Sequence, residues 1–189
     1  MPRKFALAVL VTVVAASPAF AAETPADLKA EAAGLVKEYA ATLQTTLKGA
    51  MTASGPVGGI AVCHERSPEI AADLSRRSGW TVGRTSLKLR SPASAPDAYA
   101  TKVMQEFEQR IAKGEAAADL VKAEVVDEDG KKEFRFIKAI PTGDVCLTCH
   151  GTEVKPEIGA KLHELYPNDR ATGFKAGDMR GVFTLSKRL

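Results

Sequence analysis

The sequence predicts an α+β domain, an antiparallel sheet with flanking helices, and three observations support this fold class. Apolar residues recur at helical spacing from about residue 24 to 48 and again from 96 to 113. Two apolar segments, 120–126 and 132–140, are separated by a turn sequence and indicate a β-hairpin. A last apolar segment, 180–185, indicates one more strand, so the chain combines helices with an antiparallel sheet.

The first 21 residues have the three parts of a secretory signal peptide: a basic start, an apolar run and an Ala-x-Ala site. We expect cleavage between Ala21 and Ala22, which leaves one exported domain, residues 22–189, in the periplasm. An uncleaved membrane anchor is the alternative, but the run is short for a bilayer span, and we expect no other span. Removing the two basic residues of this segment brings the net charge of +3 to about +1, so nothing indicates a nucleic-acid partner.

The first half of the domain is predicted to be mainly helical. Gly55-Pro56 is expected to break the chain after the first helix, and a short apolar segment, 57–62, follows. Ser67-Pro68-Glu69 is typical of a helix start, so we expect a second, short helix from there to about Arg77. The residues from Trp80 to Leu89 have an extended pattern and predict a strand, and a Ser- and Pro-rich loop, 91–96, precedes the next helix.

The predicted hairpin leads directly into Cys146-Leu147-Thr148-Cys149-His150, a Cys-x-x-Cys-His motif of the kind that attaches a c-type haem. Two thiols at this spacing add to the two vinyl groups of haem, and the next imidazole reaches one face of the iron. Cys146 and Cys149 are therefore the predicted attachment residues for one haem c, and His150 is the predicted proximal ligand. Export agrees with this prediction, because such attachment takes place outside the cytoplasm.

The motif could also be a redox-active cysteine pair, part of a zinc site or a disulfide. A thioredoxin-type redox pair usually opens a helix after a strand near the start of a chain. A zinc site needs a second pair of ligands, and only Cys63 and scattered histidines remain. A disulfide closing so small a loop is uncommon. We expect the motif to lie in a long loop beside the sheet, unlike the helical layouts of the commonest cytochromes.

Several ordered blocks of the chain resemble secreted c-type haem proteins with a PAS-like fold, which also occur as ectodomains of histidine kinases and chemoreceptors. The resemblance covers roughly residues 30–187, and it departs from the family at Ser91 and Ser94, where asparagines are usual. The blocks are Cys63 with 67–71, 83–92, 146–151, 166–173 and 177–181. This resemblance implies a PAS-like sheet, one haem c and a cysteine thiolate on the iron opposite the motif histidine.

Cys63 is the thiol left over once the motif cysteines carry haem, and it has no disulfide partner in the chain. It is either a small buried core residue or the distal iron ligand, and the resemblance favours ligation. His64 is the main alternative ligand, but adjacent side chains point in different directions, so only one of the two should reach the iron. Less favoured candidates are His163, Met179, Met51 and Met104.

Arg84, Lys88 and Arg90 lie in one of these blocks, where they could bind the haem propionates through charge-assisted hydrogen bonds. A solvated strand face is an equally simple explanation for three basic residues. A thiolate ligand would stabilise ferric iron, so we expect a low reduction potential.

Three functions fit a protein of this kind. The first is one-electron transfer or redox sensing, the second is sensing of a gas such as nitric oxide or carbon monoxide, and the third is an enzyme such as a peroxidase. A sensor of this length is expected to need a separate signalling partner, and an enzyme needs an open iron site. We therefore predict a periplasmic cytochrome without enzyme activity, monomeric or weakly dimeric, with an unidentified redox or signalling partner.

Overall fold

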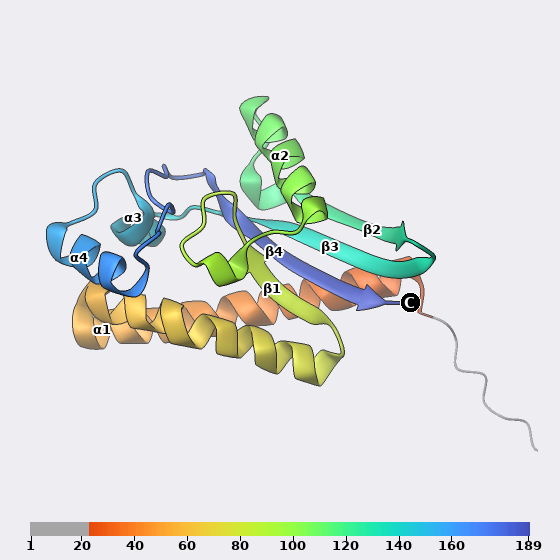
Figure 1. Ribbon diagram of the computed structural model, residues 1–189, viewed down its shortest axis with the longest axis horizontal. Helices are drawn as coiled ribbons and strands as arrows, with labels where there is room; N and C mark the ends of the chain where they lie inside the picture. Colours follow the sequence, from red (N-terminus) through yellow and green to blue (C-terminus); the bar gives the residue numbers. More distant parts are fainter. Residues whose placement is uncertain (1–22) are drawn as a thin grey trace, which may run out of the picture.

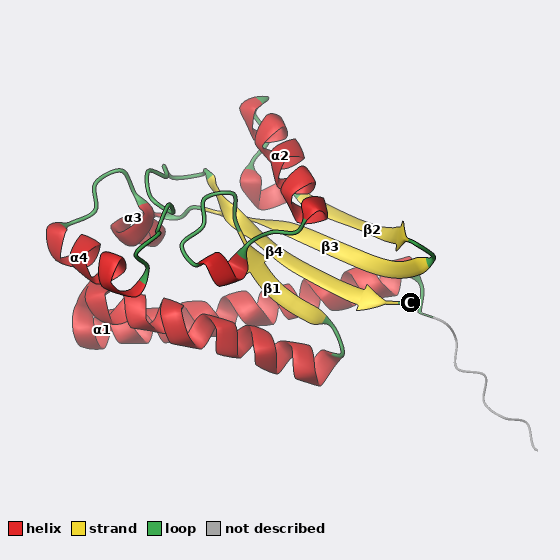
Figure 2. Ribbon diagram, in the orientation of Figure 1, coloured by secondary structure: helices red, strands yellow, loops and turns green. Residues whose placement is uncertain are grey.

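A four-stranded antiparallel sheet with the strand order β1-β4-β3-β2 forms the centre of the structure (Figure 2). The computed structural model describes residues 23–189, so the predicted signal peptide and its cleavage point lie outside the described residues. The strands are β1 (Thr81–Thr85), β2 (Val121–Glu128), β3 (Lys131–Pro141) and β4 (Met179–Arg188). The prediction of an α+β fold with an antiparallel sheet and flanking helices is confirmed.

Helix α1 (Pro25–Ser78) consists of two arms that meet at Gly55 and fold back on each other (Figure 1). Gly55 has φ 67° and ψ −173°, a backbone conformation that only glycine adopts readily, so the predicted break is confirmed. Thr24 caps the first arm: its hydroxyl accepts a hydrogen bond from the Asp27 amide, and the Asp27 carboxylate accepts one from the Thr24 amide. Gly79 ends the second arm in a left-handed conformation.

The second arm begins directly after Gly55, so the predictions of a separate apolar segment at 57–62 and of a helix start at Ser67 were wrong. Pro68 lies inside the helix, where it removes one hydrogen bond. Ser67, Ile70 and Leu74 are buried on the same arm, and their packing helps to offset that loss. A local Ser-Pro-Glu signal was therefore overridden by packing against the rest of the protein.

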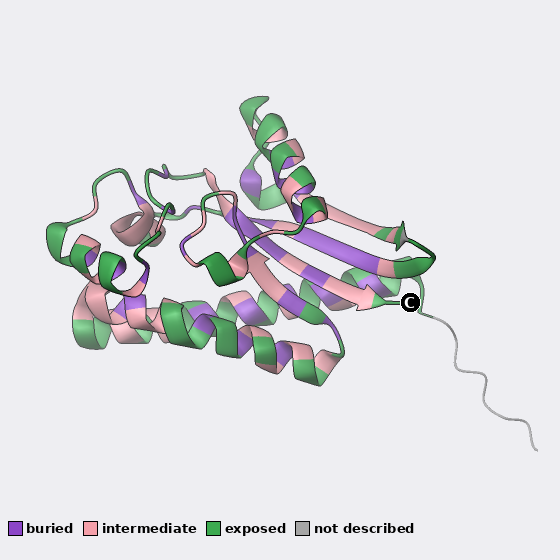
Figure 3. Ribbon diagram, in the orientation of Figure 1, coloured by how far each residue is buried: buried purple, intermediate pink, exposed green. Residues whose placement is uncertain are grey.

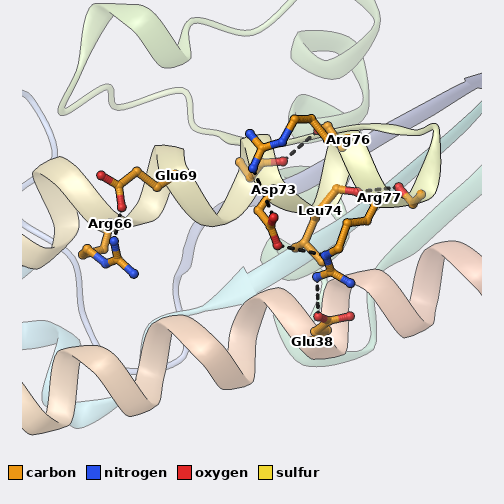
Figure 4. A network of polar contacts seen from close by, with 10 residues as sticks. Glu38, Arg66, Glu69, Asp73, Leu74, Arg76 and Arg77 are labelled. Carbon is orange, nitrogen blue, oxygen red and sulfur yellow. Dashed lines mark hydrogen bonds and ion pairs between the residues drawn. The ribbon is translucent and has the colours of Figure 1, made fainter.

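The two arms of α1 cover one face of the sheet. Both arms contribute to one apolar cluster with Trp80, Val82, Phe134 and Phe183 of the sheet side. An exposed ion pair also joins the arms, because Arg77 Nη2 on the second arm lies 2.6 Å from Glu38 Oε1 on the first (Figure 4).

Helix α2 (Ala98–Ala112) covers the opposite face of the sheet and begins at Asp97, whose carboxylate accepts a hydrogen bond from the Ala100 amide. Its buried face packs with Leu120 and Ile137 in a second apolar cluster. The sheet is therefore buried between two helical layers, as the buried bands along β3 and β4 show (Figure 3). Short 3-10 helices at Pro92–Ser94 and Ala117–Asp119 precede and follow α2.

Two short helices, α3 (Asp144–His150) and α4 (Pro156–Leu165), lie beside the turn of α1 at one end of the molecule (Figure 1). The Cys-x-x-Cys-His motif therefore lies on a helix rather than in the expected long loop. Strand β1 also ends at Thr85, four residues before the predicted Leu89, because pairing with β4 stops at the register Thr85–Val182. In residues 23–189 no helix is both long and apolar enough to span a membrane.

Gly181 of β4 lies close against the backbone at the end of β1. A Cβ atom there would lie 2.3 Å from the Thr85 carbonyl oxygen, whereas a Cβ at Gly83 on β1 would meet nothing closer than 3.7 Å. We expect Gly181→Ala to lower the free energy of unfolding by about 1–3 kcal/mol because the strands must move apart. Denaturant unfolding measures this, with Gly83→Ala as the matched control. Equal stability of the two variants would contradict the prediction.

Candidate functional site

The motif residues Cys146, Cys149 and His150 occupy the middle and end of α3, which begins directly after β3. Gly151 ends this helix, and its amide donates to the Leu147 carbonyl at 2.9 Å. A Cβ atom at Gly151 would lie 2.6 Å from that carbonyl oxygen, so the position requires glycine. The chain after α4 returns to α3, where the Phe174 amide donates to the His150 carbonyl at 2.9 Å.

Cys63 lies on the second arm of α1 and faces the same site as the two motif cysteines. All three are free and partly buried. Burial raises the pKa of the Cys63 thiol, the positive charges of Arg84, Arg90 and Arg180 oppose this rise, and Cys146 is close enough to add to it. Cys63 is thus placed with the motif cysteines, although 82 residues separate it from Cys146 in the chain.

The Cys149 thiol lacks one property that a redox-active pair needs. The motif does open a helix after a strand, which is the usual place for such a pair, so its position no longer argues against that interpretation. However, burial raises the pKa of Cys149, whereas a reactive thiol needs a lowered pKa. In the described part of the chain, no group of three His, Cys, Asp or Glu side chains is placed to hold a metal ion by itself.

His150 is held in one tautomer by a backbone carbonyl. Its Nδ1 lies 2.6 Å from the Ala171 oxygen, and a carbonyl oxygen can only accept, so Nδ1 carries the hydrogen and Nε2 carries the lone pair. Burial, together with the charges of Arg180 and Arg90, lowers the pKa of His150 to about 2. The imidazole is therefore neutral at physiological pH, the form that binds a metal.

Three guanidinium groups surround this imidazole and the Cys63 thiol. Because Nδ1 carries the hydrogen, Arg180 Nε can donate only to Nε2, which lies 3.3 Å away, although Nδ1 is 3.1 Å away. Arg90 Nη1 lies 3.4 Å from Nε2. Burial and the charges of Arg90 and Arg84 lower the pKa of Arg180 to about 10. Asp169 pairs with Arg90 at 3.1 Å, so this carboxylate balances part of the positive charge.

The three predicted basic residues occupy different places. Arg90 is buried among backbone carbonyls, and Arg84 donates from Nη2 to the Ser67 hydroxyl at 2.7 Å. Lys88 is exposed, and its Nζ lies 4.9 Å from the centre of the Phe174 ring. Phe174 in turn packs edge-on against the His150 ring at 6.2 Å, which places Lys88 at the rim of the site.

Arg180 and Asp169 were not among the predicted site residues. Both belong to sequence blocks that carry the family resemblance, and this was the signal that could have identified them. Arg180 was assigned only as the first residue of a strand, and the pattern of a strand does not show which of its charged side chains is buried. The structure brings both residues to the site through the return of the chain from α4 to β4.

The alternative iron ligands lie in less suitable places. His64 is exposed and packs edge-on against the Tyr166 ring at 5.0 Å, and His163 is exposed on α4. Met104 belongs to the buried face of α2, and Met51 is the residue that a Cβ atom at Gly59 would touch. This arrangement favours Cys63 over His64 as the residue that faces the motif helix.

Comparison with known proteins identifies the family of the chain and agrees with its fold. The model of the Tll0287-like family matches residues 17–187, so the chain belongs to this family. A solved structure, the crystal structure of the cyanobacterial heme-protein Tll0287, superimposes with a TM-score of 0.60 at 24% sequence identity. The match covers 84% of this chain and 95% of that protein, which shows a common fold. A search of curated proteins gave no match.

Ser67 connects the site to the core, because its hydroxyl accepts from Arg84 and lies 3.0 Å from the Tyr39 hydroxyl. We expect Ser67→Ala to lower the free energy of unfolding by about 1–3 kcal/mol, because a buried guanidinium donor then lacks a partner. Thr52→Ala, which removes an exposed hydroxyl from the same helix, is the matched control and should change stability by less than about 0.5 kcal/mol. Chemical denaturation compares the two, and an equally small loss for Ser67→Ala would contradict the expectation.

Proposed function

We propose that this member of the Tll0287-like family is a periplasmic c-type cytochrome that carries one covalent haem and transfers or senses single electrons. Cys146 and Cys149 would attach the haem, His150 would bind the iron on one side, and Cys63 would bind it on the other. One observation carries the proposal: a neutral histidine of the motif helix and a buried thiol from α1 share a site of concentrated positive charge. We further propose that the sheet and its helices are a PAS-like fold.

The residues of the site fit a haem in charge and in chemistry. Three arginines and one paired aspartate leave two excess positive charges. Two propionate carboxylates have the matching charge, and guanidinium groups bind carboxylates well. Among residues 23–189, Arg84 Nε is a buried donor without a hydrogen-bond partner, and a propionate would provide one. Arg84 and Arg180, with Lys88 at the rim, are the donors that this assignment uses.

A bound haem would supply a one-electron Fe(III)/Fe(II) couple. The chain would set the potential of that couple through its own groups. His150 presents the Nε2 lone pair because Nδ1 is engaged by the Ala171 carbonyl. Burial raises the pKa of the Cys63 thiol and so disfavours its thiolate form. The iron and the nearby arginines would stabilise the negative charge of that thiolate. A thiolate favours the ferric state, so we propose a low potential.

Electron transfer or redox sensing accounts for a site in which both axial positions are supplied by the chain. Gas sensing would require Cys63 to leave the iron, and a peroxidase would require an open iron and a distal acid–base group. Cys63 lies on a long, packed helix, and that placement favours a firmly bound ligand. We therefore propose no enzyme activity, and the redox partner is to be sought among exported proteins.

The absorption spectrum of the dithionite-reduced protein tests the proposal most directly. We expect a c-type haem spectrum that carbon monoxide leaves unchanged, because Cys63 and His150 would both bind the iron. The Cys146→Ala/Cys149→Ala variant is the control and should release its haem into acidic acetone. A protein without c-type bands would refute the proposal, and rapid carbon monoxide binding would favour gas sensing.

Replacing the distal thiol tests the ligand. We expect Cys63→Ala to lose the thiolate-type low-spin ferric spectrum and to raise the reduction potential, because the negative ligand is removed. His64→Ala alters the adjacent side chain of the same helix and should keep both properties. Electron paramagnetic resonance measures the ferric spectrum, and redox titration measures the potential. If His64→Ala changed both properties and Cys63→Ala changed neither, His64 would be the ligand.

A further inference from the structure

Arg90 and Asp169 form a buried pair next to the motif histidine. Their side chains are only 9% and 11% exposed, and Arg90 Nη2 lies 3.1 Å from Asp169 Oδ2. Arg90 Nε also donates to Asp169 Oδ2 at 3.2 Å. A buried ion pair is costly to form, and it is retained where further hydrogen bonds satisfy both partners.

Nη2 of Arg90 reaches the backbone around His150, and Nη1 lies 3.4 Å from His150 Nε2 itself. Nη2 donates to the Cys149 carbonyl at 2.6 Å, at the end of the motif helix, and to the Ala171 carbonyl at 3.2 Å. The Ala171 carbonyl is the one that holds His150 Nδ1. Arg90 therefore fixes the acceptor that orients the imidazole, and most of its donors are already occupied by protein groups.

Asp169 holds the same acceptor from the other side. Its Oδ1 accepts a hydrogen bond from the Ala171 amide at 2.7 Å, while Oδ2 accepts from Arg90. Ala171 itself is fully buried. The Asp169 carboxylate thus holds the Ala171 amide directly and holds the Ala171 carbonyl through Arg90. These two contacts together fix the position of the carbonyl oxygen.

We propose that Asp169 and Arg90 are positioning residues for the axial histidine, acting through the Ala171 carbonyl. This inference rests on the proposed function, and it assigns Arg90 to the histidine rather than to a haem propionate. A firm Nδ1–H···O=C bond fixes the ring plane and increases the electron density at Nε2. Loosening the carbonyl makes His150 a weaker donor, which favours ferrous iron and raises the potential.

Charge alone predicts a different result, and this difference makes the inference testable. Arg90→Lys keeps the positive charge but loses the planar group that bonds three acceptors at once. If Arg90 acts only through its charge, the potential of this variant stays unchanged. If Arg90 positions His150, the potential rises and the ferric g values change.

The matched control is the exposed pair of Arg110 and Glu115, in which Nε and Nη2 of the arginine donate to the two carboxylate oxygens at 2.6–2.8 Å. Arg110→Lys makes the same chemical change as Arg90→Lys at a place far from the motif in the fold. Redox titration and electron paramagnetic resonance of the haem-loaded protein are recorded for both variants. We expect a positive shift of the potential and altered g values for Arg90→Lys alone.

Asp169→Asn provides a second test with a side chain of the same shape, in case Arg90→Lys retains too little haem. Its g values should change in the same direction, and Glu115→Gln is its control. Wild-type potential and g values in Arg90→Lys or in haem-loaded Asp169→Asn would overturn the inference while the c-type spectrum still supports the proposed function. Absence of a c-type spectrum in the unmodified protein would overturn the proposed function itself.

Discussion

Buried positive charge at one end of the sheet is the constraint on which the arrangement of this protein depends. Arg84, Arg90 and Arg180 come from β1, from the loop after it and from β4, and the charges of Arg90 and Arg84 help to lower the pKa of Arg180. Such a cluster is unfavourable unless anionic groups or well-placed acceptors compensate for it. The structure supplies one carboxylate, two backbone carbonyls and a serine hydroxyl, which come from three different parts of the chain.

That compensation determines which elements must meet at the site. Ser67, which accepts a hydrogen bond from Arg84, lies on α1 one helical turn after Cys63. The Ser67 hydroxyl and the Cys63 thiol are therefore on the same face of the helix. The carboxylate comes from the chain between α4 and β4, where the backbone also bonds to the end of α3. The charged cluster therefore joins three regions, and an apolar cluster of Ile60, Ile158 and Leu162 also packs α1 against α4. Helix α2 lies outside this network and packs with its own apolar cluster on the other face of the sheet.

The sequence was sufficient to predict the parts of the fold that depend on local chemistry. The hairpin of β2 and β3, the break at Gly55 and helix α2 follow from turn residues and apolar spacing, and each is present. The continuous second arm of α1 was missed because its Ser-Pro-Glu sequence is a local start signal that packing overrides. The early end of β1 was missed because strand length depends on the partner strand, which lies about a hundred residues away.

The same distinction between local and distant determinants applies to the site. Cys146, Cys149 and His150 were predicted because they adjoin one another in a motif. Cys63 was predicted because it is the thiol left over by that motif and because the family resemblance implies a cysteine ligand. Arg180 and Asp169 could not be chosen from the residues alone. Each becomes important through a contact with His150 or Arg90, between segments 30 and 79 residues apart. Patterns of spacing reveal which residues share an element, but only the fold shows which elements share a site.

Helix α3 shows why the site also needs the sheet. It has seven residues, which is far too short for a helix to be stable alone. Just before α3, the Thr142 amide donates to the Asp178 carbonyl at 2.8 Å and the Gly177 amide donates to the Thr142 carbonyl at 2.9 Å, which continues the pairing of β3 and β4. At its other end, Arg90 bonds to the Cys149 carbonyl, and the returning chain bonds to His150 and Gly151. The motif helix is thus fixed at both ends by distant parts of the chain, so the orientation of His150 is a property of the whole fold.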